Sequence, residues 1–284
     1  MPELPEVETV VRGLQTVLPG RRISNVRFGK TDFMEDPAAL ERNLPGCRIS
    51  GVRRYGKFLV LDLDSSGRES PRPALLIHLG MTGRLIACPP EASVEPHTHV
   101  FFALDDRSEL RYTDIRRFGK MRFLPLGVNG SILGKLGLDP LEASEREFLA
   151  RLRGRRARIK ALLLDQRVLR GMGNIYTDES LWRARIHPKR LAANLREGEL
   201  LRLHRAVRAV LTEAIRLGGS SISDFVNSGG FPGEFQLRHR VYQRQGEKCF
   251  RCGASIRREI VAGRGSFFCP RCQPAPRVRL QRQK

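Results

Sequence analysis

Apolar residues at the start of the chain recur with the spacing of a helix. Residues 3–14 read ELPEVETVVRGL, and the valines and the last leucine fall three or four positions apart. This repeat places them on one face of an α-helix. Glutamates stand in the first turns, where the helix dipole favours negative charge. The sequence therefore predicts a helix that begins within the first few residues.

Short runs of β-forming residues fill the rest of the first half. Glycine, proline and aspartate separate them, as is typical of turns. The clearest runs are residues 22–28, 58–62, 74–79, 100–104, 109–113 and 121–124. About eight strands fit in this part of the chain, which indicates a β-sandwich or a β-barrel.

The pattern changes in a glycine-rich stretch over residues 128–140. Beyond it, apolar residues have helical spacing over residues 144–152, 159–164, 176–184 and 197–217. Several short helices joined by tight turns are typical of a helical DNA-binding domain. Residues 218–236 are rich in glycine and serine but carry three phenylalanines. Both a mobile functional lid and a plain linker fit this segment.

The charge balance indicates a polyanionic partner. The 284 residues include 51 Lys and Arg against 30 Asp and Glu, a net charge of +21. Hydrophobic residues make up 40% of the chain, which is enough for a globular protein of two domains. No apolar run approaches the roughly 20 residues of a membrane span, and the start lacks a secretory pattern. We therefore expect a cytoplasmic protein that binds nucleic acid and no membrane.

Four of the six cysteines form two pairs near the end of the chain, Cys249-x-x-Cys252 and Cys269-x-x-Cys272. Two such turns converge to give the tetrahedral thiolate site of a zinc ion. All four positions are then taken by protein ligands, so the zinc is expected to be structural.

The remaining candidate metal ligands and thiols have a simpler interpretation. His97 and His99 stand on one face of a strand, but no third ligand with matching spacing lies near them, so a structural role is favoured. Cys47 and Cys88 are expected to be unpaired thiols.

Pro2 follows a methionine that is normally removed before so small a residue. Its amine would then stand at a helix N-terminus, where the dipole lowers the pKa of an amine and leaves part of it neutral at pH 7. A neutral amine beside carboxylates is a nucleophile. The alternative is that Pro2 and Glu3 merely begin the helix.

The motifs together resemble the formamidopyrimidine-DNA glycosylase family (Fpg/Nei) from end to end. The resemblance depends on residues 2–9 (PELPEVET), 78–83 (HLGMTG), 116–119 (RRFG), 173–176 (GNIY) with 178–180 (DES), 263–265 (GRG) and the four cysteines. It implies an α+β multidomain fold with one structural Zn²⁺. The implied domains are a catalytic β-sandwich with flanking helices (1–130), a linker (131–140), a helix-two-turn-helix domain (141–240) with a lesion-capping loop (218–236), and a zinc-finger β-hairpin (241–284).

The implied activity is that of a bifunctional DNA glycosylase and abasic-site lyase of base excision repair. Its substrates would be oxidised purines, chiefly 8-oxoguanine opposite cytosine and formamidopyrimidines, with strand cleavage by β,δ-elimination. Pro2 would form an iminium with the sugar, Glu3 would be the acid/base of ring opening, and Glu6 a supporting acid or a simple first-turn charge. Lys57 would belong to the same site.

The resemblance also implies the DNA contacts. Met81, Arg116 and Phe118 would fill the space of the extruded nucleotide, with Arg116 on the orphaned cytosine. The groups that hold backbone phosphates would be Lys57, Arg117, Asn174 and Arg264, and Tyr242 would add a contact. The partner would be damaged double-stranded DNA, bound by a monomer that is nucleoid-associated in a prokaryote.

Two residues depart from the family pattern, and two other functions stay open. Ile115 replaces a common proline, which affects the geometry of the filler loop. Arg170 replaces a small residue and is expected only to add surface charge. The alternatives are an endonuclease VIII-type glycosylase for oxidised pyrimidines and a non-enzymatic zinc-finger protein that binds damaged DNA.

Overall fold

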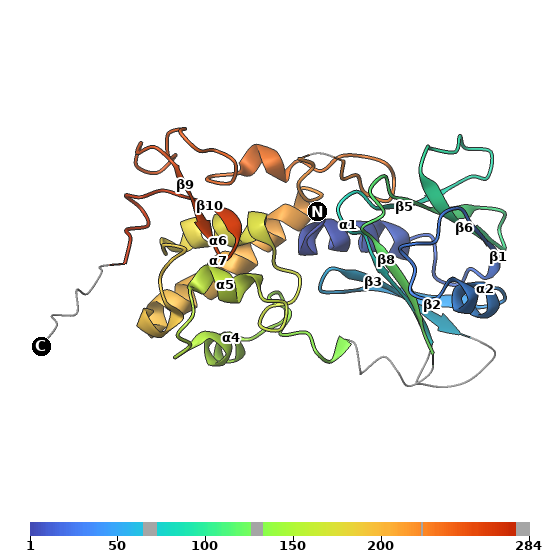
Figure 1. The fold of residues 1–284 in the computed structure, drawn as a ribbon, viewed down its shortest axis with the longest axis horizontal. Coiled ribbons are helices and arrows are strands. Elements are labelled where there is room, and N and C mark those ends of the chain that lie inside the picture. The colour runs from blue at the N-terminus through green and yellow to red at the C-terminus, as the bar shows by residue number, and fades with distance from the viewer. Residues whose placement is uncertain (65–72, 126–132, 223, 277–284) are drawn as a thin grey trace, which may run out of the picture. The chain divides into compact units, whose positions relative to one another are not determined.

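The computed structural model describes residues 1–64, 73–125, 133–222 and 224–276 (Figure 1). These residues form two compact units. The first comprises residues 1–136 and 213–237, and the second comprises residues 137–212 with the rest of the chain from Arg238. The domain boundaries expected from the sequence stay predictions, and residues 131 and 132 of the expected linker lie outside the described residues.

The first unit contains helix α1 (Leu4–Gln15) and two four-stranded antiparallel sheets. One sheet has the order β1 (Ile23–Phe28), β6 (Thr98–Leu104), β7 (Glu109–Thr113), β5 (Arg84–Cys88). The other has the order β2 (Arg48–Tyr55), β3 (Phe58–Asp64), β4 (Ala74–His78), β8 (Lys120–Leu124). Helix α2 (Pro37–Asn43) follows β1. These two separate sheets confirm the predicted β-sandwich and exclude the alternative of a closed β-barrel.

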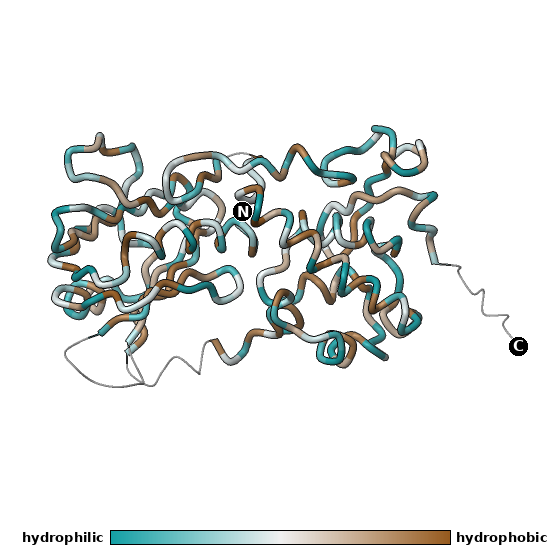
Figure 2. Tube along the Cα trace, turned by 180° about the vertical axis from the view of Figure 1, so that it is seen from behind, coloured by the Kyte–Doolittle hydropathy of each residue, from teal (hydrophilic) through white to brown (hydrophobic). Residues whose placement is uncertain are grey.

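The core of this unit contains side chains from both sheets and from α1. Val7 and Leu14 of α1 are fully buried in one cluster with Ile49 of the second sheet and Phe102 of the first. The helical repeat seen in the sequence therefore marks the face of α1 that packs on the sandwich. Figure 2 shows apolar segments recurring along strands and helices, with polar residues in many of the connecting turns.

The second unit contains the predicted helical region and the cysteine-rich end. Its helices are α4 (Glu145–Leu152), α5 (Ile159–Leu164), α6 (Asn174–Ala184), the short η1 (Ala192–Asn194) and α7 (Glu197–Arg216), whose last turn from Glu213 belongs to the first unit. The short helix η2 (Phe235–Arg238) follows and belongs to the first unit up to Leu237. The antiparallel hairpin of β9 (Arg257–Val261) and β10 (Arg264–Phe268) then lies in the second unit. Helix α6 packs on β10. No helix of the described ranges is long and apolar enough to cross a membrane.

Candidate active site and nucleic-acid interface

The start of α1 brings two buried carboxylates next to Pro2. Glu3 is the N-cap of the helix and is 4% exposed, and Glu6 in the first turn is 2% exposed. The backbone N–H of Glu3 donates a 2.8 Å hydrogen bond to Glu6 Oε2. Pro2 is buried, whereas Met1 is exposed. The structure thus places the predicted nucleophile and both predicted acids at one helix end.

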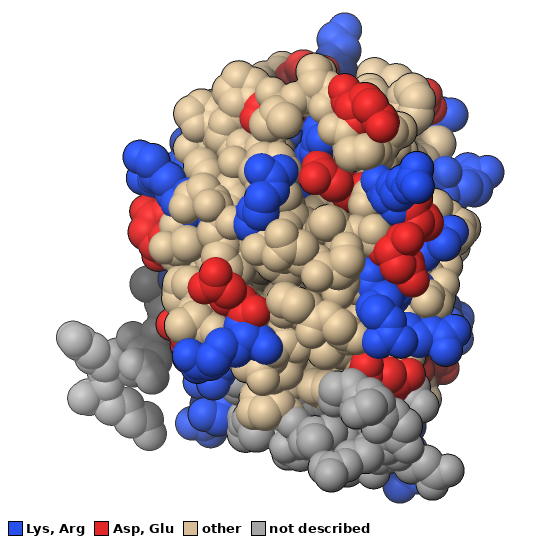
Figure 3. All heavy atoms as spheres, turned by 90° about the vertical axis from the view of Figure 1, so that its right-hand side faces the viewer, with Lys and Arg blue, Asp and Glu red and all other residues tan. Residues whose placement is uncertain are grey.

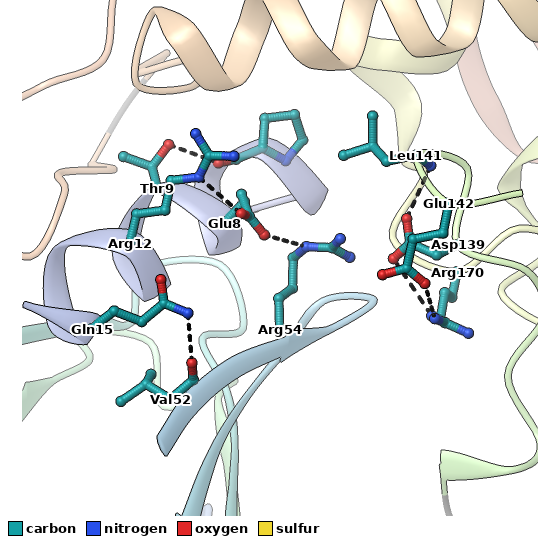
Figure 4. Close-up of polar contacts among 11 residues, drawn as sticks. Glu8, Thr9, Arg12, Gln15, Val52, Arg54, Asp139, Leu141, Glu142 and Arg170 are labelled. Atoms are coloured by element: carbon teal, nitrogen blue, oxygen red, sulfur yellow. Dashed lines mark hydrogen bonds and ion pairs between the residues drawn. The ribbon is translucent and has the colours of Figure 1, made fainter. Parts of the chain in front are cut away.

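Polar contacts fix α1 on β2 (Figure 4). Arg54 of β2 donates to Glu8 at 2.8 Å, and the Arg54 side chain is only 7% exposed. Two turns later along the helix, Gln15 donates to the backbone carbonyl of Val52 at 2.9 Å. These contacts hold the helix against the sheet along its length.

Lys57 lies in the tight turn between β2 and β3 and is 9% exposed. Residue His78, at the end of β4, is paired with Lys120 across the sheet. Burial and the charges of Lys57 and Lys120 lower the pKa of His78 to about 4. The neutral ring accepts a hydrogen bond at Nδ1 from the N–H of Gly80 at 3.0 Å. This bond fixes the start of the turn that carries Met81.

The three predicted void fillers come from two loops of the first unit. Met81 follows β4 and is 38% exposed, while Phe118 lies between β7 and β8 and is 54% exposed. The Arg116 guanidinium lies 4.5 Å from the centre of the Phe118 ring. Large apolar side chains that stay exposed in this way are available to a partner.

The neighbouring Arg117 adopts a left-handed backbone conformation with φ of 53°. Its guanidinium forms an ion pair with Asp32 at 3.3 Å. Both residues line a cavity of about 600 Å³ together with Phe118. Arg117, which is predicted to bind a phosphate, is therefore paired with a carboxylate in this structure.

The segment after α7 is folded against the N-terminal end of α1. The N–H of Ser220 donates a 2.7 Å hydrogen bond to Glu6 Oε1. Gly219 has a φ of +81°, and a Cβ there would lie 2.8 Å from the same oxygen. Close approach of the chain to Glu6 therefore requires a glycine at this position. Residue 223 of the predicted capping loop lies outside the described residues.

Arg84 of β5 holds the same segment further along. Its Nε donates to the backbone carbonyl of Asp224 at 3.1 Å, and its Nη1 contacts Glu95 at 3.3 Å. The Ser221 hydroxyl donates to the Phe225 carbonyl at 2.6 Å. Sequence reasoning missed Arg84, because nothing in a short β run indicates which distant loop its side chain contacts.

In the second unit, a buried ion pair joins α5, α6 and the hairpin. Lys160 Nζ lies 2.7 Å from Asp178 Oδ1, and both side chains are fully buried. Lys160 and Asn174 both donate to the Gly265 carbonyl, at 3.2 and 3.0 Å. Asp178 also accepts from the N–H of Phe267 at 2.9 Å. The predicted phosphate contact Asn174 is thus bound to the strand that begins with the exposed Arg264.

Glu179 fixes the segment that carries Tyr242. Its buried carboxylate accepts hydrogen bonds from the N–H groups of Arg240, Val241 and Tyr242 at 2.9 to 3.0 Å. The Tyr242 ring packs edge-on against Phe267 with 5.3 Å between ring centres. Tyr242 is therefore held beside the same hairpin as Arg264.

The four C-terminal cysteines form a structural zinc site. Their sulfur atoms all lie within 4.8 Å of one another, with 3.4 Å between Cys252 and Cys269 and 4.0 Å between Cys249 and Cys272. A tetrahedral zinc with four bonds of about 2.3 Å separates its sulfurs by about 3.8 Å, so the donor set fits this ion. Four thiolates leave no open position for catalysis. Within the described ranges, no other group of three or more such ligands comes together.

The structure corrects the interpretation of Arg170 (Figure 4). Its side chain is only 17% exposed. It donates to the Gly137 carbonyl at 3.0 Å and forms ion pairs with Glu142 at 3.3 Å and Asp139 at 3.6 Å. Arg170 therefore links the chain after Gly137 to the loop before α6 and does not merely add surface charge. Cys47 and Cys88 are free thiols, as expected.

Positive charge is distributed unevenly over the surface. On the face drawn in Figure 3, basic and acidic side chains are interspersed around uncharged surface. By contrast, the end of α4 and the segment between it and α5 carry five exposed arginines: Arg151, Arg153, Arg155, Arg156 and Arg158. Sequence reasoning did not select this cluster, although the run RLRGRRAR is a clear signal for a polyanion-binding surface.

Three family profiles match the chain in order. They describe the formamidopyrimidine-DNA glycosylase N-terminal domain over residues 1–121, the H2TH domain of the same enzyme over residues 136–226, and a zinc finger found in FPG and IleRS over residues 246–275. The match to the last profile covers all four cysteines.

Individual proteins match over almost their whole length. A formamidopyrimidine-DNA glycosylase of Solibacter usitatus is 45% identical over 96% of this chain and 99% of its own. Two crystal structures from Lactococcus lactis each cover 96% of this chain and 100% of theirs with a TM-score of 0.85. One is an Fpg point mutant with DNA that contains Fapy-dG (35% identity), and the other is wild-type Fpg with DNA that contains an oxidised pyrimidine (34%). The chain belongs to the formamidopyrimidine-DNA glycosylase family.

Proposed function

We propose that the chain is a bifunctional DNA glycosylase and abasic-site lyase that excises oxidised purines from double-stranded DNA. The observation that carries this proposal is the placement of Pro2 beside two buried carboxylates, of which Glu6 accepts hydrogen bonds from the Glu3 and Ser220 N–H groups. Glu3 and Glu6 form a capping box at the start of α1. A capping box does not need buried carboxylates, and burial of a carboxylate is unfavourable unless its oxygens are paired.

Removal of Met1 would expose the secondary amine of Pro2. Its lone pair attacks C1′ of the damaged nucleotide, and the glycosidic bond breaks with its electron pair on the departing base. The base takes up the proton that the Pro2 nitrogen loses on bonding to C1′. Glu3 gives a proton to O4′ as the C1′–O4′ bond opens, and an iminium forms between Pro2 and C1′. Glu6 supports this step by holding the Glu3 N–H and the Ser220 N–H.

The iminium acidifies the hydrogens on C2′. Loss of one of these protons expels the 3′ phosphate, and a second elimination expels the 5′ phosphate, which leaves a one-nucleotide gap with phosphate ends. Water then hydrolyses the iminium and restores the amine. The chemistry requires the nucleotide to be out of the base stack, and Met81, Arg116 and Phe118 would replace it there.

The remaining site residues would hold the DNA. Lys57, Arg117 and Arg264 supply cationic groups for phosphates, and Asn174 supplies an amide. The zinc site fixes the fold of the cysteine-rich end and supplies no chemistry to the reaction. We further propose a monomeric protein in the cytoplasm, because every group named here belongs to a single chain and the substrate is cellular DNA.

Oxidised pyrimidines are a second candidate substrate. The structure of the Lactococcus lactis relative with DNA that contains an oxidised pyrimidine favours this option. A duplex with thymine glycol, compared with one that carries 8-oxoguanine opposite cytosine, measures the preference. We expect faster excision of 8-oxoguanine.

The experiment that tests the proposal is borohydride trapping on the 8-oxoguanine duplex, followed by mass spectrometry of the crosslinked peptide. We expect an adduct on Pro2, and Pro2→Gly should weaken both base release and strand cleavage. Glu3→Gln, which keeps the amine, should retain DNA binding and lose the trapped adduct on this duplex, because O4′ then lacks its proton donor and the iminium does not form. Tight binding without any adduct from a protein that begins at Pro2 would instead favour a non-enzymatic DNA-binding protein.

A further inference from the structure

The two loops that carry the predicted void fillers are packed backbone against backbone. A Cβ on Gly80 would overlap the Phe118 carbonyl and the N–H of Gly119, and Gly80 has a φ of +62°. A Cβ on Gly119 would overlap the hydroxyl of Tyr112. Loops in such close contact have little freedom to move separately, so Met81 and Phe118 form one surface.

The carboxylate of Asp114, which is fully buried, holds both loops. Its Oδ2 accepts from the N–H of Gly119 at 2.9 Å and from the Tyr112 hydroxyl at 3.0 Å. Burial and the Asp114 charge raise the pKa of Tyr112, so that hydroxyl stays a donor. Oδ1 accepts from the Thr82 hydroxyl at 2.6 Å. One carboxylate thus ties the loop of Met81 to the loop of Phe118.

Thr82 has a second contact that reaches Arg116. While its hydroxyl donates to Asp114, the same oxygen accepts from the backbone N–H of Arg116 at 3.1 Å. Thr82 is 9% exposed, so water does not readily replace either bond. The backbone of Arg116 is therefore set by a residue next to Met81 in the other loop.

The residue between Asp114 and Arg116 makes this bond more important. Ile115 is 52% exposed, so little packing holds its backbone in place. Proline would fix φ by its ring, whereas isoleucine leaves the backbone free to rotate in the absence of other restraints. The hydrogen bonds of Asp114 and Thr82 supply that restraint here.

We propose that Thr82 is the positioning residue that sets opposite-base discrimination in this chain, through its bond to the Arg116 backbone. The inference rests on the proposed function, in which Arg116 contacts the orphaned base. Bidentate contacts to a base edge require a fixed donor geometry, and a displaced backbone spoils them without removing a catalytic group.

The test compares excision of 8-oxoguanine opposite cytosine and opposite adenine by the full-length protein. Thr82→Val keeps the shape and removes the hydroxyl, and we expect the cytosine-over-adenine ratio to fall about fivefold, the factor of one lost hydrogen bond. Thr82→Ser restores the hydroxyl and should restore the ratio. Tyr112→Phe also removes one hydrogen bond to Asp114 but leaves Arg116 bound, so it should keep the ratio.

Each outcome separates the inference from the proposed function. A wild-type protein that excises nothing contradicts the function itself. A wild-type protein that excises equally opposite both bases, or a Thr82→Val protein with the wild-type ratio, overturns the role of Thr82. So does an equal loss in Tyr112→Phe, because that result would reflect general loosening of the cluster. Should Thr82→Val not fold, Thr82→Ala gives the same comparison without an added methyl group in place of the hydroxyl.

Discussion

The backbone N–H of Ser220 donates a 2.7 Å hydrogen bond to the buried carboxylate of Glu6, although 214 positions separate the two residues in sequence. The other Glu6 oxygen accepts from Glu3. Glu6→Gln has only one oxygen acceptor for these two donors. We expect it to lower the free energy of unfolding by about 1–3 kcal/mol, the cost of an unsatisfied buried group, and to slow base excision. Urea unfolding and single-turnover kinetics measure the two effects.

Glu8→Gln is the matched control for that change. Glu8 lies on the same helix but contacts Arg12 and Arg54 instead of Glu3 and Ser220. Glu8→Gln should lower the free energy of unfolding and leave the rate of the chemical step unchanged. Equal loss of rate in both variants would show that Glu6 acts only through the stability of α1.

Arg84→Ala should slow excision of a base and spare cleavage at a preformed abasic site. Arg84 holds the carbonyl of Asp224 in the segment that also contacts Glu6. A loop that covers an extruded base matters only while a base is present. We expect kcat/KM on 8-oxoguanine DNA to fall about fivefold to tenfold, which corresponds to about 1–1.5 kcal/mol.

Arg21→Ala is the control that tests whether the loss of any arginine slows base excision. Arg21 forms a comparable ion pair with Asp106 at 3.0 Å on the same unit. It should leave both rates at the wild-type level. The role assigned to Arg84 is wrong if its removal slows excision and abasic cleavage by the same factor.

Local patterns were enough to predict most elements of the fold. The helix expected over residues 3–14 forms over Leu4–Gln15, and the helix expected over residues 159–164 forms over Ile159–Leu164. Strand β2 escaped individual prediction because a register shift between Ile49 and Gly51 breaks the alternation of buried and exposed residues. Strand β5 was also not predicted individually, because it is only five residues long and begins with an arginine.

The contacts that shape the site could not be predicted from the sequence. Thr82 and Asp114 lie 32 positions apart, and Arg84 reaches a carbonyl 140 positions away. No periodicity encodes such pairs, because they depend on how whole strands and loops pack. The cysteine pairs were predictable because close spacing and one metal impose the geometry locally.

The stability that two buried histidines contribute should fall as the pH is lowered from 6.5 towards 4. Burial is the main cause that lowers the pKa of His78 and of His239 to about 4, against an ordinary value of 6.5. Between these values the unfolded chain binds the proton and the folded chain does not, so acid favours unfolding. The full stability contribution is present above pH 6.5, and each histidine loses about 3 kcal/mol of it at most by pH 4.

The difference in unfolding free energy between a histidine variant and the wild type, followed against pH, isolates the contribution of that histidine. Asp178 acts with the opposite sign, because burial raises its pKa to about 7 and protonation then stabilises the folded chain as the pH falls. Urea unfolding of His78→Gln and His239→Gln from pH 7.5 to 5 should each show a flatter dependence than wild type. Parallel curves for variant and wild type would contradict the shifted values.

Removal of zinc should change the fluorescence of Trp182. It is the single tryptophan of the chain, and it packs in one buried cluster with Cys249, Ile256 and Cys269. The Arg251 guanidinium lies 4.1 Å from its ring. Chelation, or Cys249→Ser, should unfold this cluster, shift the emission of Trp182 to longer wavelength and weaken DNA binding.

Cys88→Ser is the control, because Cys88 is a free thiol outside the zinc site. It should keep the metal content, the emission and the affinity of the wild type. Loss of zinc with unchanged emission would mean that the cysteine-rich end stays folded without its metal.

The salt dependence of DNA binding distinguishes charged phosphate contacts from neutral ones. The affinity falls as salt is added, and each cationic contact makes the slope of log K against log salt concentration steeper by about 0.9. Lys57→Ala, Arg117→Ala and Arg264→Ala should each reduce the slope by about that amount. Asn174→Ala should lower affinity at every salt concentration and leave the slope unchanged, because the amide carries no charge and also holds the Gly265 carbonyl.

Arg27→Ala is the control. It removes a largely exposed arginine paired with Glu109 and should change neither the affinity nor the slope. Binding to a duplex with an abasic-site analogue from about 50 to 200 mM salt gives all five slopes, and an unchanged slope for Arg264→Ala would remove that residue from the phosphate contacts.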